Sequence, residues 1–280
     1  MSAPNLLFIY TDEQAFNTLA AYGNRGIQMP NLNRLAAESM VFDQAYVTQP
    51  VCTPARSSIL TGLFPHTTGC TELNIPLPAD CLCLPEMIEH GDLMGSHRLI
   101  AKCVMFEESV RVPLLIRLPG QQTSERISGP VSQIDLVPTL LDLMDQPLPD
   151  HLQGRSLRRV IESGDRISRE SVVIEWNGPN NGLGSTIFER PMPEWMTAHA
   201  SPQEILAACE DPVRTIIRPD GWKFNCSPLG EHELYNLEQD PHEMRNLYHE
   251  ERRGTLVREL ANEIRAWQNR TDDPVELSAS

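Results

Sequence analysis

The sequence predicts an α/β fold in which a mixed, mostly parallel sheet is flanked by helices and followed by a small C-terminal α+β subdomain. In the first half of the chain, short apolar runs alternate with segments of helical periodicity, a pattern typical of α/β domains. After a polar stretch around 145–165, three further apolar runs precede a closing helical segment. The 280 residues suffice for one large domain with an appendage, and we place the domains at 1–150 and 151–280.

The first predicted strand ends at an acidic turn. Residues 5–10 form an apolar run that stops at Thr11-Asp12-Glu13, as expected of a buried strand with carboxylates at its carboxyl end. Functional sites in open α/β sheets gather outside such strand ends. Pro30 then opens a predicted helix, and residues 41–47 are predicted to form the second strand.

Residues 49–62 predict a helix with a cysteine at its start. Pro54 suits the first turn of a helix, and Gly62 suits its end. Cys52 is therefore expected at or just before the helix N-terminus. Backbone N–H groups and the positive end of the helix dipole favour anions at such a position.

The remaining elements are predicted from apolar runs and periodicity. A strand is predicted at 112–118, and an amphipathic helix at 133–144 has Asp135 near its start. The subdomain is expected to contain strands at 172–175, 213–218 and 222–226, and a closing helix at 256–267.

The composition excludes several kinds of partner. With a net charge of −15, the chain has no surplus of cations to neutralise nucleic acid, so an anion site must be local. Neither a basic leader segment nor a long apolar stretch is visible near Met1, and we expect a cytoplasmic protein without a membrane partner. The seven cysteines are odd in number and irregularly spaced, which favours reduced thiols.

The pattern Cys52-x-Pro54-x-Arg56, running on to Thr61-Gly62, resembles the signature of the sulfatase family, the formylglycine-dependent type I sulfatases of the alkaline-phosphatase superfamily. The motif is specific because it joins a modifiable cysteine, a helix-starting proline and an arginine one turn later. Further stretches similar to the family lie at 5–12, 29–35, 60–66, 106–117 and 231–243. The resemblance implies an alkaline-phosphatase-like fold, here incomplete.

The resemblance implies a hydrolase of sulfuric esters whose nucleophile is made from Cys52. In the family, a separate formylglycine-generating or anaerobic sulfatase-maturating enzyme oxidises this cysteine to formylglycine. The hydrated aldehyde attacks sulfur, the alcohol leaves, and sulfate is then expelled. Arg56 is expected to pair with the nucleophile's oxygen or with the sulfate. Lys102 matches a catalytic, sulfate-binding lysine of the family, and His97 is a further substrate-binding candidate.

The resemblance also implies a divalent metal bound by oxygen ligands, with Ca²⁺ expected and Mg²⁺ as the alternative. Such a cation would stabilise the alkoxide form of the nucleophile and polarise a sulfate oxygen. The expected ligands are the modified Cys52 and the side chains of Asp12, Glu13, Glu89 and His90. Glu13 has an equal claim to be a solvated loop charge, and Glu89 stands where the family has aspartate.

Part of the family's catalytic domain is missing from this sequence. Residues 86–89 run straight into Gly91, where family members continue through a long middle region, so we place an internal deletion near 89–91. His90 then has a second interpretation, as the end of the preceding helix. We expect weakened turnover on a small-molecule or carbohydrate sulfate ester. Two alternatives stay open: a phosphodiesterase or phosphonate monoester hydrolase on the same scaffold, and a truncated, non-catalytic remnant.

Overall fold

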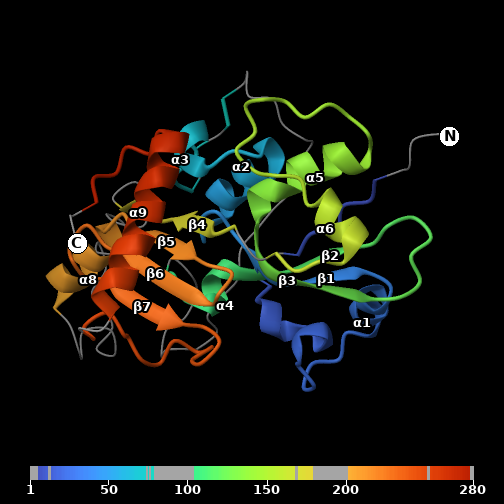
Figure 1. Ribbon diagram of the computed structural model, residues 1–280, viewed down its shortest axis with the longest axis horizontal. Coiled ribbons are helices and arrows are strands. Elements are labelled where there is room, and N and C mark those ends of the chain that lie inside the picture. The colour runs from blue at the N-terminus through green and yellow to red at the C-terminus, as the bar shows by residue number, and fades with distance from the viewer. Residues whose placement is uncertain are drawn as a thin grey trace.

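Two sheets, each covered by helices, make up the fold (Figure 1). The computed structural model describes residues 6–11, 14–73, 75, 77–78, 104–167, 170–178, 201–250 and 253–277. Within these residues, one sheet has three strands in the order β2-β1-β3 and the other has four in the order β4-β5-β6-β7. The mixed sheet therefore comes first along the chain and the smaller α+β unit second, in the predicted order.

The first sheet is mixed in strand direction. Its central strand β1 (Met40–Tyr46) pairs antiparallel with β2 (Arg111–Ile116) and parallel with β3 (Glu125–Ser132). The register of both pairings shifts after Phe42. The Tyr22 hydroxyl lies at this irregularity, where it donates to the Phe42 carbonyl at 2.8 Å and accepts from the backbone N–H of Leu114 at 3.1 Å. A side chain thus satisfies backbone groups that the ladder leaves open.

Short helices surround the first sheet. In Figure 1, η1, η2 and α1 lie on the side of this sheet opposite α2 and α5. The elements are η1 (Phe16–Thr18), η2 (Ala20–Tyr22), α1 (Pro30–Ala37), α2 (Cys52–Thr61), α3 (Pro65–Thr68), α4 (Glu107–Val110), η4 (Gln133–Asp135), α5 (Leu136–Leu143) and α6 (Arg158–Ser163). The predicted helix at 133–144 begins as a 3-10 turn, in which Asp135 Oδ2 accepts from the Ser132 backbone N–H at 2.9 Å.

The second sheet is antiparallel throughout. β4 (Val172–Glu175), β5 (Arg214–Ile217), β6 (Trp222–Cys226) and β7 (Glu233–Asn236) pair in chain order, and α8 (Pro202–Glu210) precedes β5. The closing helix α9 (Gly254–Thr271) lies across this sheet in Figure 1. Phe224 of β6 and Leu260 and Ile264 of α9 are fully buried in one apolar cluster. The three strands and the helix predicted here are confirmed, whereas β7 was not predicted.

The apolar clusters cross from one sheet to the other. The cluster beneath α9 also contains Phe64 and Ile134 from the first sheet's helices. A second cluster joins Tyr46 and Val47, at the end of β1, to Val172 and Ile174 of β4. The two sheets therefore share buried surface, and the division of the chain at 150/151 stays a prediction.

The predicted first strand is not formed. In the described part of the predicted strand, residues 6–10 are not assigned to any strand, and Leu6, Leu7, Phe8 and Ile9 are between 40% and 80% exposed. The apolar composition predicted a buried strand, but a buried strand also needs neighbouring strands on both edges, which composition does not report.

Candidate active site

Cys52 is the first residue of α2. The preceding Val51 is extended (φ −142°, ψ 141°) and gives the helix no side-chain cap. The carbonyl of Val51 accepts the first intrahelical hydrogen bond, from Ala55 N at 3.0 Å. Pro54 lies in the first turn, where its missing N–H costs the helix nothing. The half-buried Cys52 therefore lies at the positive end of the helix dipole, as predicted.

Arg56 lies one turn after Cys52 on the same helix. Residues four apart in an α-helix share a face. The side chains of Cys52 and Arg56 are both half-buried, whereas Pro54, Ala55 and Ser57 of the same helix are buried. The structure thus brings together two of the predicted catalytic residues. A cationic guanidinium and a helix N-terminus on one face form a local anion-attracting region within an acidic chain.

Hydroxyl groups hold the buried face of α2. Thr48 donates to the Ser58 hydroxyl at 2.7 Å, and both side chains are fully buried. Thr61 donates to the Ser57 carbonyl at 2.7 Å, and Ser57 to the Pro54 carbonyl at 2.8 Å. The Ser and Thr residues that follow Arg56 therefore pack inward with their polar atoms satisfied. The Thr48–Ser58 hydrogen bond ties the helix that carries Cys52 to the loop before it, whereas the bonds of Ser57 and Thr61 stay within the helix.

Gly62 ends α2 in a position that only glycine fits well. Its φ is +71°, and it donates to the Ser58 carbonyl. A Cβ at this residue would come within 2.8 Å of Leu152 Cδ2 and 3.3 Å of Val137 Cβ. The helix therefore ends at Gly62, as predicted, because the left-handed backbone and the close packing there both favour glycine.

His66, just after α2, is bound at both ring nitrogens. Nδ1 lies 2.5 Å from Glu175 Oε2, and Nε2 lies 3.0 Å from the Thr271 carbonyl oxygen. A carbonyl only accepts, so Nε2 carries a proton. Burial lowers the pKa of His66, but the hydrogen bond to Glu175 and the charge of that carboxylate raise it, and the net shift is upward. His66 joins the end of the helix carrying Cys52 to the C-terminal unit.

The other predicted site residues lie outside the described residues. They are Asp12, Glu13, Glu89, His90, His97 and Lys102. Of the expected metal ligands, only Cys52 is described, and the part of the chain that the structure describes contains no group of three His, Cys, Asp or Glu side chains able to hold a metal. The metal site therefore stays a prediction from the sequence.

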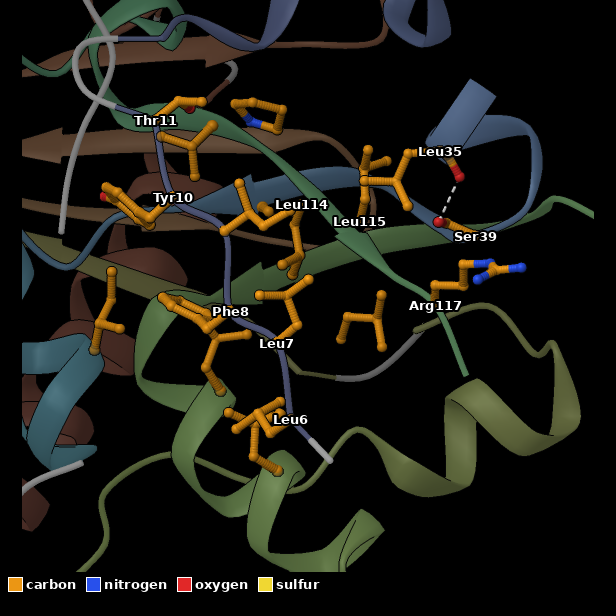
Figure 2. Close-up of a pocket in the computed structure, with 18 of the residues that line it drawn as sticks. Leu6, Leu7, Phe8, Tyr10, Thr11, Leu35, Ser39, Leu114, Leu115 and Arg117 are labelled. Atoms are coloured by element: carbon orange, nitrogen blue, oxygen red, sulfur yellow. Dashed lines mark hydrogen bonds between the residues drawn. The ribbon is translucent and has the colours of Figure 1, made fainter. Parts of the chain in front are cut away.

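A cavity of about 710 Å³ lies beside the exposed N-terminal segment. Figure 2 shows Leu6, Leu7 and Phe8 along this segment, close to Leu114 and Leu115 of β2. Its wall is predominantly aliphatic, with Arg117 as the one charged side chain among the described lining residues. Such a lining can accommodate apolar side chains, but it cannot solvate a charged sulfate group. The cavity is lined by residues 6–11 and is no candidate for the catalytic centre.

Sequence reasoning missed a buried ionic cluster between the two sheets. Lys223 Nζ of β6 lies 3.1 Å from Glu107 Oε1 of α4 and 2.8 Å from Glu243 Oε1. The Glu107 backbone N–H donates to Glu243 Oε2 at 2.7 Å, and Tyr46 donates to Glu107 Oε2 at 3.1 Å. Burial raises the pKa of Glu243 to about 7, against the opposing effect of Lys223. The sequence contained one indication of this cluster: Glu107 lies shortly before β2, in the stretch 106–117 that resembles the family.

Two family models match adjacent parts of the chain. The sulfatase model matches residues 4–91, and the model for the C-terminal region of N-sulphoglucosamine sulphohydrolase matches residues 95–181. The boundary between the two matched stretches lies beside the internal deletion that the sequence predicts near residues 89–91.

Curated relatives are considerably longer than this chain. Uncharacterized sulfatase YidJ of Escherichia coli (strain K12) is 28% identical over 190 residues, which cover 66% of this chain and 32% of that protein. The N-acetylglucosamine-6-O-sulfatase of Bacteroides thetaiotaomicron is 31% identical over 103 residues, covering 35% of this chain and 18% of that protein. The chain thus spans about a third or less of the length of these relatives.

Solved structures confirm the fold class. One solved protein, determined in complex with its substrate D-glucosamine-2-N,6-O-disulfate, superposes on this chain with a TM-score of 0.79. The two sequences are 14% identical, and the match covers 98% of this chain and 99% of that one. At this identity the likeness shows the fold alone, which is alkaline-phosphatase-like α/β. None of the helices in the described ranges has the length and apolar character needed to cross a membrane.

Proposed function

Since the chain belongs to the sulfatase family of the alkaline-phosphatase superfamily, we propose that it is built to hydrolyse sulfuric esters with a formylglycine made from Cys52. The observation that carries this proposal is the placement of Cys52 at the start of α2, with Arg56 one turn later on the same face. A maturating enzyme would supply the oxidation, since the chain's own residues offer no oxidant.

The helix and the arginine are proposed to bind and orient the anionic ester. The positive end of α2 attracts a negatively charged sulfate group, and Arg56 offers charge-assisted hydrogen bonds to its oxygens. Both act locally, which matters in a chain of net charge −15 that repels anions at long range. Hydrated formylglycine supplies the attacking hydroxyl, and the buried hydrogen bond between Thr48 and Ser58 holds the helix in place beneath it.

A divalent cation, expected to be Ca²⁺, would stabilise the anionic nucleophile when bound. Its proposed ligands are Asp12, Glu13, Glu89 and His90 together with the modified residue 52. Lys102 and His97 are proposed to contact the sulfate group, with Lys102 taking part in catalysis. If the deletion near 89–91 removed the acid for the leaving alcohol, turnover would be about 10²–10⁴-fold below that of complete relatives.

We propose a sulfated carbohydrate as the substrate class. Support comes from the sulfatase of Bacteroides thetaiotaomicron, which is named for N-acetylglucosamine-6-O-sulfate, and from the structural neighbour solved with a disulfated glucosamine. Sugar hydroxyls and a single sulfate need a polar site, unlike the apolar cavity beside residues 6–11.

The test uses the chain co-produced with a formylglycine-generating enzyme. Hydrolysis of an aryl sulfate and of N-acetylglucosamine-6-O-sulfate is compared with hydrolysis of an aryl phosphate and an aryl phosphonate, with Ca²⁺ or with a chelator. We expect slow, Ca²⁺-dependent release of sulfate that Cys52→Ala abolishes and Arg56→Ala reduces by about 10²–10³-fold.

Cys70→Ala is the matched control, because Cys70 is fully buried outside the signature helix. It should leave turnover unchanged. Preferential hydrolysis of the phosphonate would favour the alternative activity on this scaffold. Absence of all turnover in a folded chain that contains formylglycine would leave only the non-catalytic remnant.

A further inference from the structure

We propose that Asn177 is a positioning residue, which fixes the loop leading into Cys52 through Gln49 and is itself oriented by the buried Arg214–Asp273 ion pair. For its consequence in catalysis the inference rests on the proposed function, but its structural content does not. The residues come from four places in the chain: the loop before α2, the residues after β4, strand β5, and the residues after α9.

The loop between β1 and α2 is held from the C-terminal unit. The Glu175 backbone N–H donates to the Thr48 carbonyl at 2.8 Å. Asn177 Nδ2 donates to Gln49 Oε1 at 2.6 Å, and Gln49 Nε2 donates to the Thr71 carbonyl at 2.9 Å. The Gln49 carbonyl in turn accepts from Val51 N at 2.8 Å, one residue before Cys52. The side chain of Gln49 is fully buried, so this loop has little freedom while Asn177 is in place.

The Asn177 amide has a defined orientation. Its Oδ1 accepts from Arg214 Nη2 at 3.0 Å, so its Nδ2 is directed to Gln49. Arg214 Nη1 also donates to the Trp176 carbonyl at 2.7 Å. A guanidinium cannot accept, and therefore the amide cannot rotate by half a turn without losing this bond. The donor that faces Gln49 is thus selected by Arg214 together with Glu175, whose Oε1 accepts from the same Nδ2 at 3.0 Å.

Arg214 is itself held by a bidentate contact to Asp273. Nε lies 2.9 Å from Oδ2 and Nη2 lies 2.7 Å from Oδ1, with both side chains fully buried. Burial raises the pKa of Asp273, but its hydrogen bonds to Arg214 lower it, and the net shift is downward. Burying an ion pair is costly, and a hydrophobic pair would serve stability alone at least as well. The ion pair instead fixes the orientation of the planar Arg214 guanidinium, so that one of its N–H groups donates to Asn177.

The same C-terminal segments also hold the far end of α2. Glu175 binds His66 after the helix, and the Thr271 carbonyl binds the other nitrogen of that ring. The end of β4 therefore contacts both the loop before α2 and His66 after it, and the end of α9 contacts His66. This is the arrangement expected if the C-terminal unit positions the nucleophile.

The experiment measures alkylation of Cys52 by iodoacetamide in the full chain made without a maturating enzyme, with each cysteine followed by peptide mass spectrometry. Asn177→Ala should loosen the loop and raise the alkylation rate at the half-buried Cys52 by about tenfold, the equivalent of one lost hydrogen bond. Asn177→Asp keeps the acceptor for Arg214 but places a carboxylate oxygen against Gln49 Oε1 and against Glu175 Oε1, which accepts from Asn177 Nδ2 at 3.0 Å in the wild type. It should give the same increase at Cys52, with a loss in thermal stability at least as large because two buried carboxylates then face each other.

Asn225→Ala is the matched control, because Asn225 is a buried asparagine of the same sheet that bonds Thr215 and Glu233. It should lower the melting temperature and leave the rate at Cys52 unchanged. Amide NMR provides a second measurement, with resonances of Gln49 and Val51 expected to move in both Asn177 variants and to stay in place in Asn225→Ala. Equal rates and unmoved resonances in all three variants would overturn the proposal. Neither measurement needs formylglycine or turnover, so failure of the proposed function leaves this result interpretable.

Discussion

The two sheets differ in how completely their strands are covered. In the C-terminal sheet, strands β4 to β7 pair with chain neighbours, and nearly every strand residue is buried beneath α9 and its surroundings. In the first sheet, β2 is only half-buried along its whole length, and the apolar residues 6–9 lie exposed beside it. The C-terminal unit is closed by segments near in sequence. In the described residues the first sheet leaves apolar surface uncovered, and the Escherichia coli relative, about twice as long as this chain, has room for further elements beside it.

The comparison predicts that the largest losses of stability come from the junction between the sheets. Lys223→Met removes the cation that contacts both Glu107 and Glu243, and leaves Arg111 at 3.5 Å from Glu107, so the free energy of unfolding should fall by about 3–5 kcal/mol. Because the pKa of Glu243 is about 7, the loss should be larger well above pH 7 than well below it. Urea unfolding at the two pH values measures both effects. A loss within about 1 kcal/mol would show that the cluster does not join the sheets.

A matched pair of leucine truncations sharpens the contrast. Leu260→Ala in α9 opens a cavity at a fully buried position and should cost about 2–5 kcal/mol. Leu7→Ala changes a side chain that is 80% exposed and should stay within about 0.5 kcal/mol. Denaturant midpoints of the two variants provide the comparison. Similar losses would mean that residues 6–9 are buried in solution, and the contrast between the sheets would then disappear.

The smallest expected effect concerns His66. Its pKa is raised in the folded state, so its contribution to stability is fully present below the unfolded value and is lost as pH rises through the folded value. Wild-type stability should therefore decline across this window, and His66→Gln should flatten the decline. The exposed His242→Gln is the control and should follow the wild type. A decline of equal slope in His66→Gln would remove His66 from the account.

Local chemistry made most of the elements predictable. Pro54 and Gly62 correctly marked the two ends of the helix that carries Cys52, because proline and glycine restrict or permit particular backbone angles. Apolar runs located β2, β4, β5 and β6 within about two residues, the usual uncertainty of element ends. The face shared by Cys52 and Arg56 followed from helical spacing alone.

Long-range partners could not be predicted in the same way. Residues 6–10 have the composition of a strand, yet strand formation depends on neighbours that periodicity does not report. β3 was missed because Gly129 and Pro130 interrupt its apolar pattern. The Asn177–Arg214–Asp273 contacts join residues nearly one hundred positions apart, and nothing in their local sequence indicates that they meet.

The formation of formylglycine at residue 52 is measured by mass spectrometry of the peptide containing this residue, after co-production with a formylglycine-generating enzyme. We expect the mass loss that accompanies conversion of Cys52 to formylglycine, together with reaction of the new aldehyde with a hydrazide probe. Cys70 and Cys226, which are buried in the described structure, should keep the mass of cysteine. The contradicting result would be an unmodified thiol at position 52 after exposure of the chain to the maturating enzyme. A known sulfatase that is converted under the same conditions provides the control.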